Sequence, residues 1–265
     1  MPFIASTDIE LYFETRGTGA PLVLIPGFAS GAWSWQWQVD EFAALFRVIT
    51  FDPRGVAQSK MADGGAVSIE DIAGDITAIL DELAIEKTNI LGISFGGFVA
   101  QEFALKYPRR LKKLVLASTS FGGPNHVLPA AEVLASFASA EGMNSADRIR
   151  RSLTQAFSTD FVTRRADVVE RFCGLRESNT VPEDVYMQQL QSAMAFSTEE
   201  RVSGIDAETL VLTGDQDTVV PAQNSHNLAS KLPNARLEVI RNAGHMAFVE
   251  RADEFNQVVR EFLTS

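Results

Sequence analysis

The chain has 265 residues, of which 46% are hydrophobic, so one large α/β domain with an insertion, or two small domains, can form a buried core. It carries 34 acidic residues against 23 Lys and Arg, a net charge of −11. This negative field disfavours binding to nucleic acid or to anionic membranes, because both surfaces are themselves negatively charged.

Cysteine and histidine are scarce. Cys173 is the one cysteine, which excludes an intrachain disulfide, and with only three histidines we expect neither a metal site nor a cofactor. No basic and apolar leader opens the sequence, and no apolar run approaches the length of about 18 residues that a membrane span requires. A cytoplasmic location is therefore expected.

Strand and helix patterns alternate over the first part of the chain. Runs rich in β-branched and aliphatic residues predict strands at Ile9–Phe13, Leu22–Ile25, Val48–Phe51, Asn89–Ile93 and Leu114–Ala117. Between the later runs, apolar residues at helical spacing predict helices. Ser68 would be the N-cap residue of one of them, which has acidic residues in its first turn. Such alternation implies right-handed crossovers and a mainly parallel sheet. The first run leads instead into a turn at Arg16–Gly19, which predicts an antiparallel strand pair.

The alternation stops at Gly122 and resumes after Glu200. The intervening sequence shows only helical patterning, with candidate helices at Ala131–Ala140, Ala146–Phe157, Val168–Leu175 and Glu183–Phe196. We therefore predict one core domain, residues 1–121 and 201–265, that is interrupted by a helical cap over residues 122–200. Such an insertion would lie over the carboxyl ends of the strands, where open α/β sheets bind ligands.

A serine lies at a sharp turn between a strand and a helix. The residues Gly92-Ile93-Ser94-Phe95-Gly96-Gly97 follow the strand Asn89–Ile93 and give the pattern G-x-S-x-G in the setting that this motif requires. Glycine on either side lets strand and helix pass closely while the serine adopts a strained backbone conformation. The hydroxyl of Ser94 would then stand at a helix N-terminus, where negative charge is favoured. We identify Ser94 as the candidate nucleophile.

A serine hydroxyl needs an adjacent base to attack at neutral pH. His245 follows the predicted strand Leu237–Ile240 and so lies at the same sheet edge as Ser94. His226 falls within a helical stretch among polar residues, and His126 follows Leu114–Ala117, which makes it the closer rival. Position and chain order favour His245.

The partner of the base should follow an intermediate strand. The loop after Thr209–Leu212 offers two carboxylates, Asp215 and Asp217, and spacing alone does not choose between them. A buried carboxylate fixes the tautomer of the imidazole and stabilises the imidazolium that forms. The order serine, aspartate, histidine matches that of one class of serine hydrolases.

These motifs together resemble the α/β-hydrolase superfamily over nearly the whole chain. The matching pieces are Ile25-Pro26-Gly27-Phe28, Phe51-Asp52-Pro53-Arg54-Gly55-Val56-Ala57-Gln58-Ser59, the Ser94 turn, Gly214-Asp215-Gln216-Asp217 and Gly244-His245. The resemblance implies a mostly parallel eight-stranded sheet with an antiparallel N-terminal pair, helices on both faces and a helical cap. It also places the acid at Asp217 and the oxyanion-hole N–H groups at Phe28 and Phe95.

The sequence departs from the family pattern at two positions. Pro26-Gly27 stands where His-Gly is usual, and Ala57 replaces a glycine, so the geometry of two loops is in question. Within the superfamily the chain looks most like the 3-oxoadipate enol-lactonase and cofactor-free perhydrolase group. Haloalkane dehalogenases and soluble epoxide hydrolases are similar too, but they use an aspartate where this chain has Ser94.

Aromatic and thioether side chains near the catalytic loops suggest an apolar pocket. Phe121, Met246 and Phe248 are candidate pocket residues, although each fits a simple core role as well. Seven arginines fall in one stretch of the cap: Arg148, Arg150, Arg151, Arg164, Arg165, Arg171 and Arg176. An arginine facing the pocket would suit a substrate carboxylate, but we favour a solvated helix surface.

The leading functional hypothesis is hydrolysis of a carboxylic ester or lactone through an acyl-enzyme on Ser94, in a monomer or homodimer that acts on a small molecule with an apolar acyl part. One alternative is cofactor-free perhydrolysis or halide oxidation, in which peroxide intercepts the same acyl-enzyme. The other is a ligand sensor or partner-binding protein on a hydrolase scaffold.

Overall fold

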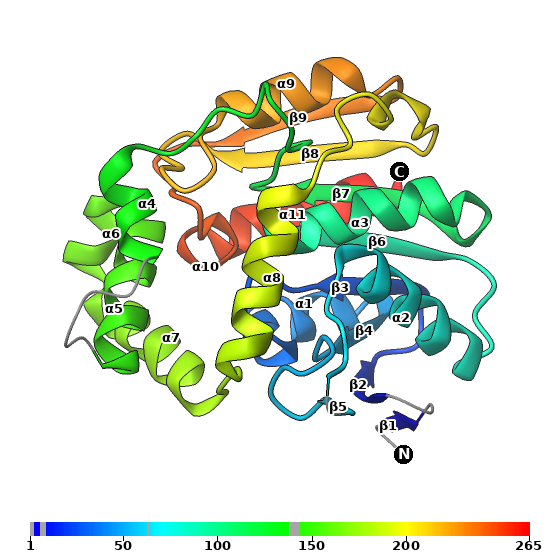
Figure 1. Ribbon diagram of the computed structural model, residues 1–265. Coiled ribbons are helices and arrows are strands. Elements are labelled where there is room, and N and C mark those ends of the chain that lie inside the picture. Colours follow the sequence, from blue (N-terminus) through cyan, green and yellow to red (C-terminus); the bar gives the residue numbers. More distant parts are fainter. Residues whose placement is uncertain (1–2, 6–8, 63, 138–143) are drawn as a thin grey trace.

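A computed structural model describes residues 3–5, 9–62, 64–137 and 144–265. In this part of the chain nine strands form one sheet in the order β1-β2-β4-β3-β6-β7-β8-β9, with β5 paired to β2 outside this path (Figure 1). Strand β2 is antiparallel to β1, β4 and β5, and the other pairs are parallel. The strands are β1 (Phe3–Ala5), β2 (Ile9–Arg16), β3 (Ala20–Ile25), β4 (Phe46–Phe51), β5 (Lys60–Met61), β6 (Thr88–Ile93), β7 (Leu111–Ala117), β8 (Thr209–Gly214) and β9 (Ala235–Ile240). The predicted α/β-hydrolase fold with an antiparallel N-terminal pair is confirmed. The sheet has nine strands in the described residues and not the predicted eight, because a two-residue strand, β5, also pairs with β2.

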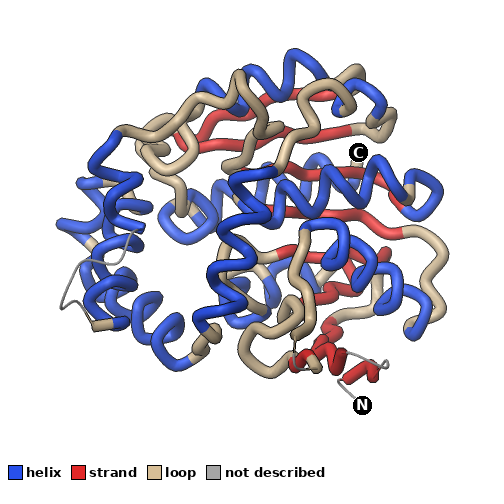
Figure 2. Tube along the Cα trace, in the orientation of Figure 1, coloured by secondary structure: helices blue, strands red, loops and turns tan. Residues whose placement is uncertain are grey.

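Helices cover both faces of the sheet (Figures 1 and 2). One face packs against α2 (Ile69–Glu82), α3 (Phe95–Lys106) and α9 (Gln223–Lys231), and the other against α1 (Val39–Ala43), α10 (Ala247–Glu250) and α11 (Ala252–Thr264). Alternate residues of β3 divide between the two cores, because Val23 joins the first and Leu24 the second. Strands buried on both faces are continuously apolar for this reason. Among the described helices none is both long and apolar enough to cross a membrane.

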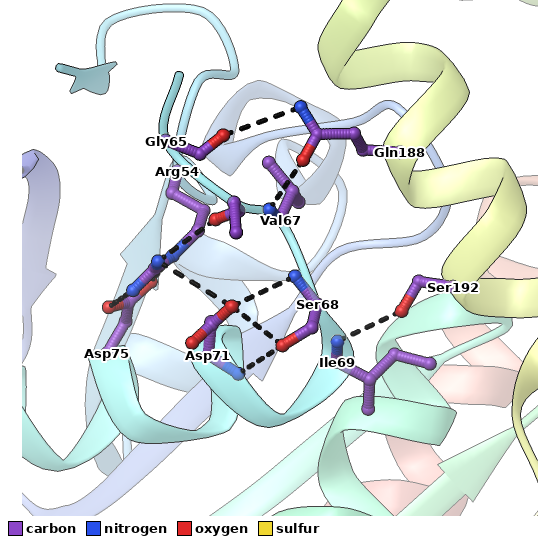
Figure 3. Close-up of polar contacts among 10 residues, drawn as sticks. Arg54, Gly65, Val67, Ser68, Ile69, Asp71, Asp75, Gln188 and Ser192 are labelled. Atoms are coloured by element: carbon purple, nitrogen blue, oxygen red, sulfur yellow. Dashed lines mark hydrogen bonds and ion pairs between the residues drawn. The ribbon is translucent and has the colours of Figure 1, made fainter. Parts of the chain in front are cut away.

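Helix α2 begins where the sequence predicts it. The Ser68 hydroxyl accepts a hydrogen bond from the Asp71 N–H at 3.0 Å, and the Asp71 carboxylate accepts one from the Ser68 N–H at 3.2 Å (Figure 3). This reciprocal pair satisfies two N–H groups that a helix start leaves without partners. The predicted role of Ser68 as the N-cap residue of this helix is confirmed.

The Asp52–Ser59 segment has a structural role. The buried Asp52 carboxylate accepts hydrogen bonds from the backbone N–H groups of Ala32 at 2.8 Å and Gln58 at 3.1 Å, and burial raises its pKa. Arg54 binds both oxygens of Asp75 on α2, with distances of 2.8 and 2.5 Å (Figure 3). The segment is the loop after β4, and these bonds fasten it to α2 and to the loop after β3.

Between β7 and β8 the described residues form helices and a single isolated bridge. The helices are α4 (Ala131–Phe137), α5 (Ser145–Ala156), α6 (Thr159–Arg164), α7 (Ala166–Ser178) and α8 (Glu183–Ala195). Helix α6 was not predicted, because six residues are too few to establish a helical period. The end predicted for the first helix, at Ala140, lies outside the described residues. The bridge pairs Gly122 with Ser197, so the two ends of the helical segment lie side by side.

Helix α8 is fastened to the core by polar side chains. Gln188 accepts a hydrogen bond from the Val67 N–H at 2.9 Å, and the Ser192 hydroxyl accepts one from the Ile69 N–H at 3.1 Å (Figure 3). The buried Gln189 accepts one from the Ala29 N–H at 2.8 Å. These contacts hold α8 against the core, and α8 lies between the sheet and the helices α4 to α7 (Figure 1). The division into core and cap stays a prediction.

Candidate active site

Ser94 lies at the turn between β6 and α3, with backbone angles φ 54° and ψ −118°. Its N–H donates to the Ala117 carbonyl at 2.9 Å, and the Thr119 hydroxyl donates to the Ser94 carbonyl at 2.9 Å. A Cβ atom on Gly92 would lie 2.3 Å from the Gly96 carbonyl oxygen. The close approach of strand and helix thus requires glycine, as the sequence pattern predicts.

His245 is paired with Asp217. The His245 Nδ1 and Asp217 Oδ2 atoms lie 2.9 Å apart, and both residues are buried. The other Asp217 oxygen accepts hydrogen bonds from the backbone N–H groups of Val219 at 2.9 Å and Val220 at 2.8 Å. The carboxylate is thereby fixed, and it leaves His245 Nε2 as the nitrogen that can exchange a proton. Asp215, the alternative acid, is exposed, and its Oδ1 lies 3.4 Å from the Ala243 N–H nitrogen.

The other two histidines have different surroundings. His226 is exposed on α9. His126 is half-buried, its Nδ1 lies 2.9 Å from the Ser120 hydroxyl, and burial lowers its pKa. It pairs with a hydroxyl, whereas His245 pairs with a carboxylate, so His245 is the histidine whose orientation suits a base.

The loop after β3 lies against the nucleophile. A Cβ atom on Gly27 would lie 3.7 Å from Ser94 Cβ, and the rings of Phe28 and Phe95 make an edge-to-face contact with centroids 6.2 Å apart. The structure therefore brings the two candidate oxyanion donors, the Phe28 and Phe95 N–H groups, to the neighbourhood of Ser94. Ala57, where the family pattern has glycine, has φ 48°, a left-handed conformation that an alanine adopts at some cost.

Ser94 and His245 line one cavity of about 620 Å³ between the sheet and the helices α4, α5, α7 and α8. Met246 and Phe248 line it as the sequence suggests, and so do Phe28 and Phe95. Phe121 is not among its lining residues and is instead buried in the core on the α3 side. Its loop turns back over α3, where Gln101 donates a hydrogen bond to the Ser120 carbonyl at 2.8 Å.

Two of the seven arginines line this cavity, Arg148 from α5 and Arg176 from α7. The solvated-surface interpretation is therefore wrong for these two. It holds for exposed members such as Arg164, which forms an ion pair with Asp160 at 2.8 Å. The sequence offered no signal that separates the two kinds, because the distinction depends on how α5 and α7 are rotated about their axes.

Glu250 is a buried carboxylate that the sequence analysis missed. It accepts hydrogen bonds from the Gly244 N–H at 2.9 Å, the Ser158 N–H at 3.0 Å and the Ser158 hydroxyl at 2.5 Å. Nearby, the Met246 N–H donates to the Ala156 carbonyl at 3.1 Å. These bonds join the loop that carries His245 to the junction of α5 and α6.

Replacing Glu250 by alanine should lower the free energy of unfolding by about 2–4 kcal/mol, because two backbone N–H groups lose their buried acceptor. Glu250→Gln keeps an acceptor oxygen and should cost less. Glu254→Ala, an exposed control on α11, should stay within about 0.5 kcal/mol of wild type in urea unfolding. Equal values for Glu250→Ala and Glu254→Ala would contradict the bracing role.

The same residue gives a pH dependence. Burial raises the pKa of Glu250 above its ordinary value of 4.5, so the folded chain binds this proton more tightly than the unfolded chain. The proton-linked part of its contribution to stability, which is separate from the hydrogen bonds it accepts, is therefore fully present below pH 4.5 and is lost as pH rises through the raised pKa. Glu250→Gln should remove this component from a plot of unfolding free energy against pH.

Comparison with known proteins agrees with this fold. A family model described as the alpha/beta hydrolase fold matches residues 20–252. The chain is 30% identical to a 2-hydroxy-6-oxononadienedioate/2-hydroxy-6-oxononatrienedioate hydrolase of Burkholderia vietnamiensis, with 97% of this chain and 92% of that protein covered.

Solved structures give the same result. The enol-lactonase from Burkholderia xenovorans LB400 superposes with a TM-score of 0.85 and 26% identity, with 100% of both chains covered. A meta-cleavage product hydrolase from Pseudomonas fluorescens IP01 has a TM-score of 0.82 and 26% identity, with 97% of this chain and 94% of that chain covered. These relatives are hydrolases of small molecules. The chain belongs to the alpha/beta hydrolase fold family.

Proposed function

We propose that the protein is a serine hydrolase that cleaves a carboxylic ester or lactone through an acyl-enzyme. The observation that carries this proposal is the pairing of His245 with Asp217 at 2.9 Å in a cavity that Ser94 also lines. The enol-lactonase among the similar structures supports the ester or lactone class.

The reaction follows from the roles of these groups. His245 Nε2 takes the proton of the Ser94 hydroxyl as its oxygen attacks the acyl carbon, and the Phe28 and Phe95 N–H groups stabilise the oxyanion. Collapse of this intermediate expels the alcohol oxygen, which receives the proton from His245. Water then attacks the acyl-enzyme as His245 takes its proton, and the carboxylic acid and free Ser94 are released.

The cavity suits a small molecule with an apolar acyl part. Apolar side chains from the core and the helical segment line most of it, among them Phe98, Leu153, Leu190 and Phe248. We assign residues 1–121 and 201–265 to the catalytic core and residues 122–200 to a cap that completes the pocket. The proposed step uses protein groups and water alone.

Labelling with a fluorophosphonate tests the nucleophile directly. Wild-type protein should gain one adduct in intact-mass spectra, and peptide mapping should locate it at Ser94. Ser94→Ala should not be labelled, whereas Ser152→Ala, a change to another serine of the same cavity, should be labelled like wild type. Absence of labelling in wild type, or equal labelling of Ser94→Ala, would refute the proposal.

Turnover assays separate the remaining alternatives. The proposal expects hydrolysis of p-nitrophenyl esters or lactones by wild type and not by Ser94→Ala. Peroxide turnover in acetate that exceeds ester hydrolysis would favour perhydrolysis. A ligand that raises the melting temperature while no ester or lactone turns over would favour a sensor.

A further inference from the structure

Helix α8 contacts the loop after β3 beside the proposed oxyanion hole. The side-chain oxygen of Gln189 accepts a hydrogen bond from the Ala29 N–H at 2.8 Å, and both residues are buried. Ala29 directly follows Phe28, whose N–H is one of the two candidate oxyanion donors. A helix between β7 and β8 therefore supplies a hydrogen-bond partner to the backbone of the loop that carries Phe28.

The backbone at Ala29 needs such a partner. Its φ of 51° lies in the left-handed region, where the Cβ atom of alanine is crowded, so this conformation persists only where surrounding groups hold it. Gln189 binds the N–H of the peptide group between Phe28 and Ala29. The Ser30 hydroxyl donates to the carbonyl of the same peptide group at 3.3 Å. Both polar groups of this planar unit are thus engaged, and its rotation would redirect the neighbouring Phe28 N–H.

The ring of Phe28 contacts both α8 and the nucleophile turn. It meets the Tyr186 ring of α8 edge to face, with centroids 4.7 Å apart, and the Phe95 ring edge to face, with centroids 6.2 Å apart. Phe95 follows Ser94 and carries the other candidate donor. Helix α8 therefore contacts the loop through the side chain of Phe28 as well as through the backbone of Ala29, on the side of the loop where the two donors meet.

Two other bonds fix α8 on the core independently of Gln189. The side chains of Gln188 and Ser192 accept hydrogen bonds from backbone N–H groups around the start of α2, at 2.9 and 3.1 Å (Figure 3). These bonds remain when the side chain of Gln189 is changed, so α8 should keep its place. The contact of Gln189 with the loop can therefore be removed without removing the helix that carries it.

We propose that Gln189 is a positioning residue for the oxyanion hole, which a helix of the proposed cap thereby completes. By holding the Ala29 N–H, its side chain sets the direction of the Phe28 N–H before the substrate binds. A donor placed in advance costs no reorganisation when the acyl oxygen gains charge, and a misplacement of about 1 Å can cost about 100-fold in rate. The effect should be largest in the transition state, where that oxygen carries more negative charge than in the bound substrate. This inference rests on the proposed function, with Ser94 as the nucleophile and the Phe28 N–H as an oxyanion donor.

Gln189→Leu tests this role, because leucine has a similar volume but cannot accept a hydrogen bond. On the p-nitrophenyl ester that wild type hydrolyses best, its kcat should fall roughly 10- to 100-fold while KM changes by less than about threefold. Gln191→Leu makes the same substitution at an exposed position of α8 and should match wild type in both constants. If the melting curve shows that Gln189→Leu does not fold, Gln189→Asn, whose side chain is one methylene group shorter, makes the same comparison.

Inhibition by a trifluoromethyl ketone separates an effect on the oxyanion hole from general damage. The Ser94 oxygen adds to the ketone carbon, the hydroxyl proton passes to His245, and the ketone oxygen becomes the oxyanion. Because this adduct resembles the transition state, its inhibition constant in Gln189→Leu should rise by about the factor by which kcat/KM falls. Gln191→Leu should bind the inhibitor as wild type does. A smaller folded fraction, by contrast, would lower the measured kcat and leave the inhibition constant unchanged.

The outcomes distinguish failure of this inference from failure of the proposed function. A wild-type kcat in Gln189→Leu, a loss that appears in KM alone, or a lower kcat with an unchanged inhibition constant would each overturn the positioning role while the serine mechanism stands. If the proposed function is wrong, wild type itself will neither hydrolyse esters nor be labelled at Ser94, and the positioning role falls with it.

Discussion

Asp217→Asn should lower kcat for ester hydrolysis by about 10⁴-fold, whereas Asp215→Asn should remain close to wild type. The Asp217 carboxylate receives the Nδ1–H of His245, and it is held there by the N–H groups of Val219 and Val220. An asparagine in this place can present its NH₂ group to Nδ1, which favours the tautomer that carries its proton on Nε2. That histidine cannot accept a proton from Ser94.

Initial rates on one p-nitrophenyl ester, with enzyme concentration corrected for folded protein, measure the difference. The neighbouring aspartate is the matched control, because Asp215 lies two positions away on the same loop and is exposed. Comparable losses of kcat in the two variants would mean that catalysis depends on the conformation of the loop and not on the carboxylate that contacts His245. A large loss in Asp215→Asn alone would assign the acid to Asp215.

The parts of this site that the sequence predicts are those with a local steric or topological cause. Ser94 follows a strand, precedes a helix and is flanked by glycines whose replacement would collide with backbone atoms. His245 follows β9, and parallel strands bring their carboxyl ends to one edge. Such features depend on neighbours in the sequence, so a single chain is enough to recognise them.

Other features depend on contacts between segments far apart in sequence. The Ser158–Glu250 hydrogen bond joins residues 92 positions apart, and nothing in either local sequence indicates the other. Arg176 has an ordinary helical context, and only the packing of α7 turns it toward the cavity. The prediction that Phe121 lines the pocket is wrong for the same reason. Its position after β7 suggests the pocket, but its loop folds over α3.

A second large effect, on both stability and activity, is expected from replacing Gly96 in the nucleophile turn. Gly96→Ala should lower the free energy of unfolding by about 3 kcal/mol or more, because the new Cβ would lie 2.3 Å from the Ile25 carbonyl oxygen and 2.5 Å from that of Pro26. These are backbone atoms at the end of β3 and cannot rotate away. Relief requires a shift of the loop that carries Phe28, so activity of the folded fraction should fall by about 100-fold as well.

Gly174→Ala is the matched control, because it adds the same methyl group where no atom lies within 4 Å. Gly174 lies inside α7, so alanine should stabilise the protein by about 0.5–1 kcal/mol through the reduced backbone entropy of the unfolded chain. Urea unfolding of both variants gives their free energies of unfolding. Ester hydrolysis, measured without urea and divided by the concentration of folded enzyme, gives the rates. If Gly96→Ala matched wild type in both measurements, β3 and α3 would not approach as closely as the structure has them. If it lost stability but kept its rate, the loop with Phe28 would not supply an oxyanion donor whose position matters.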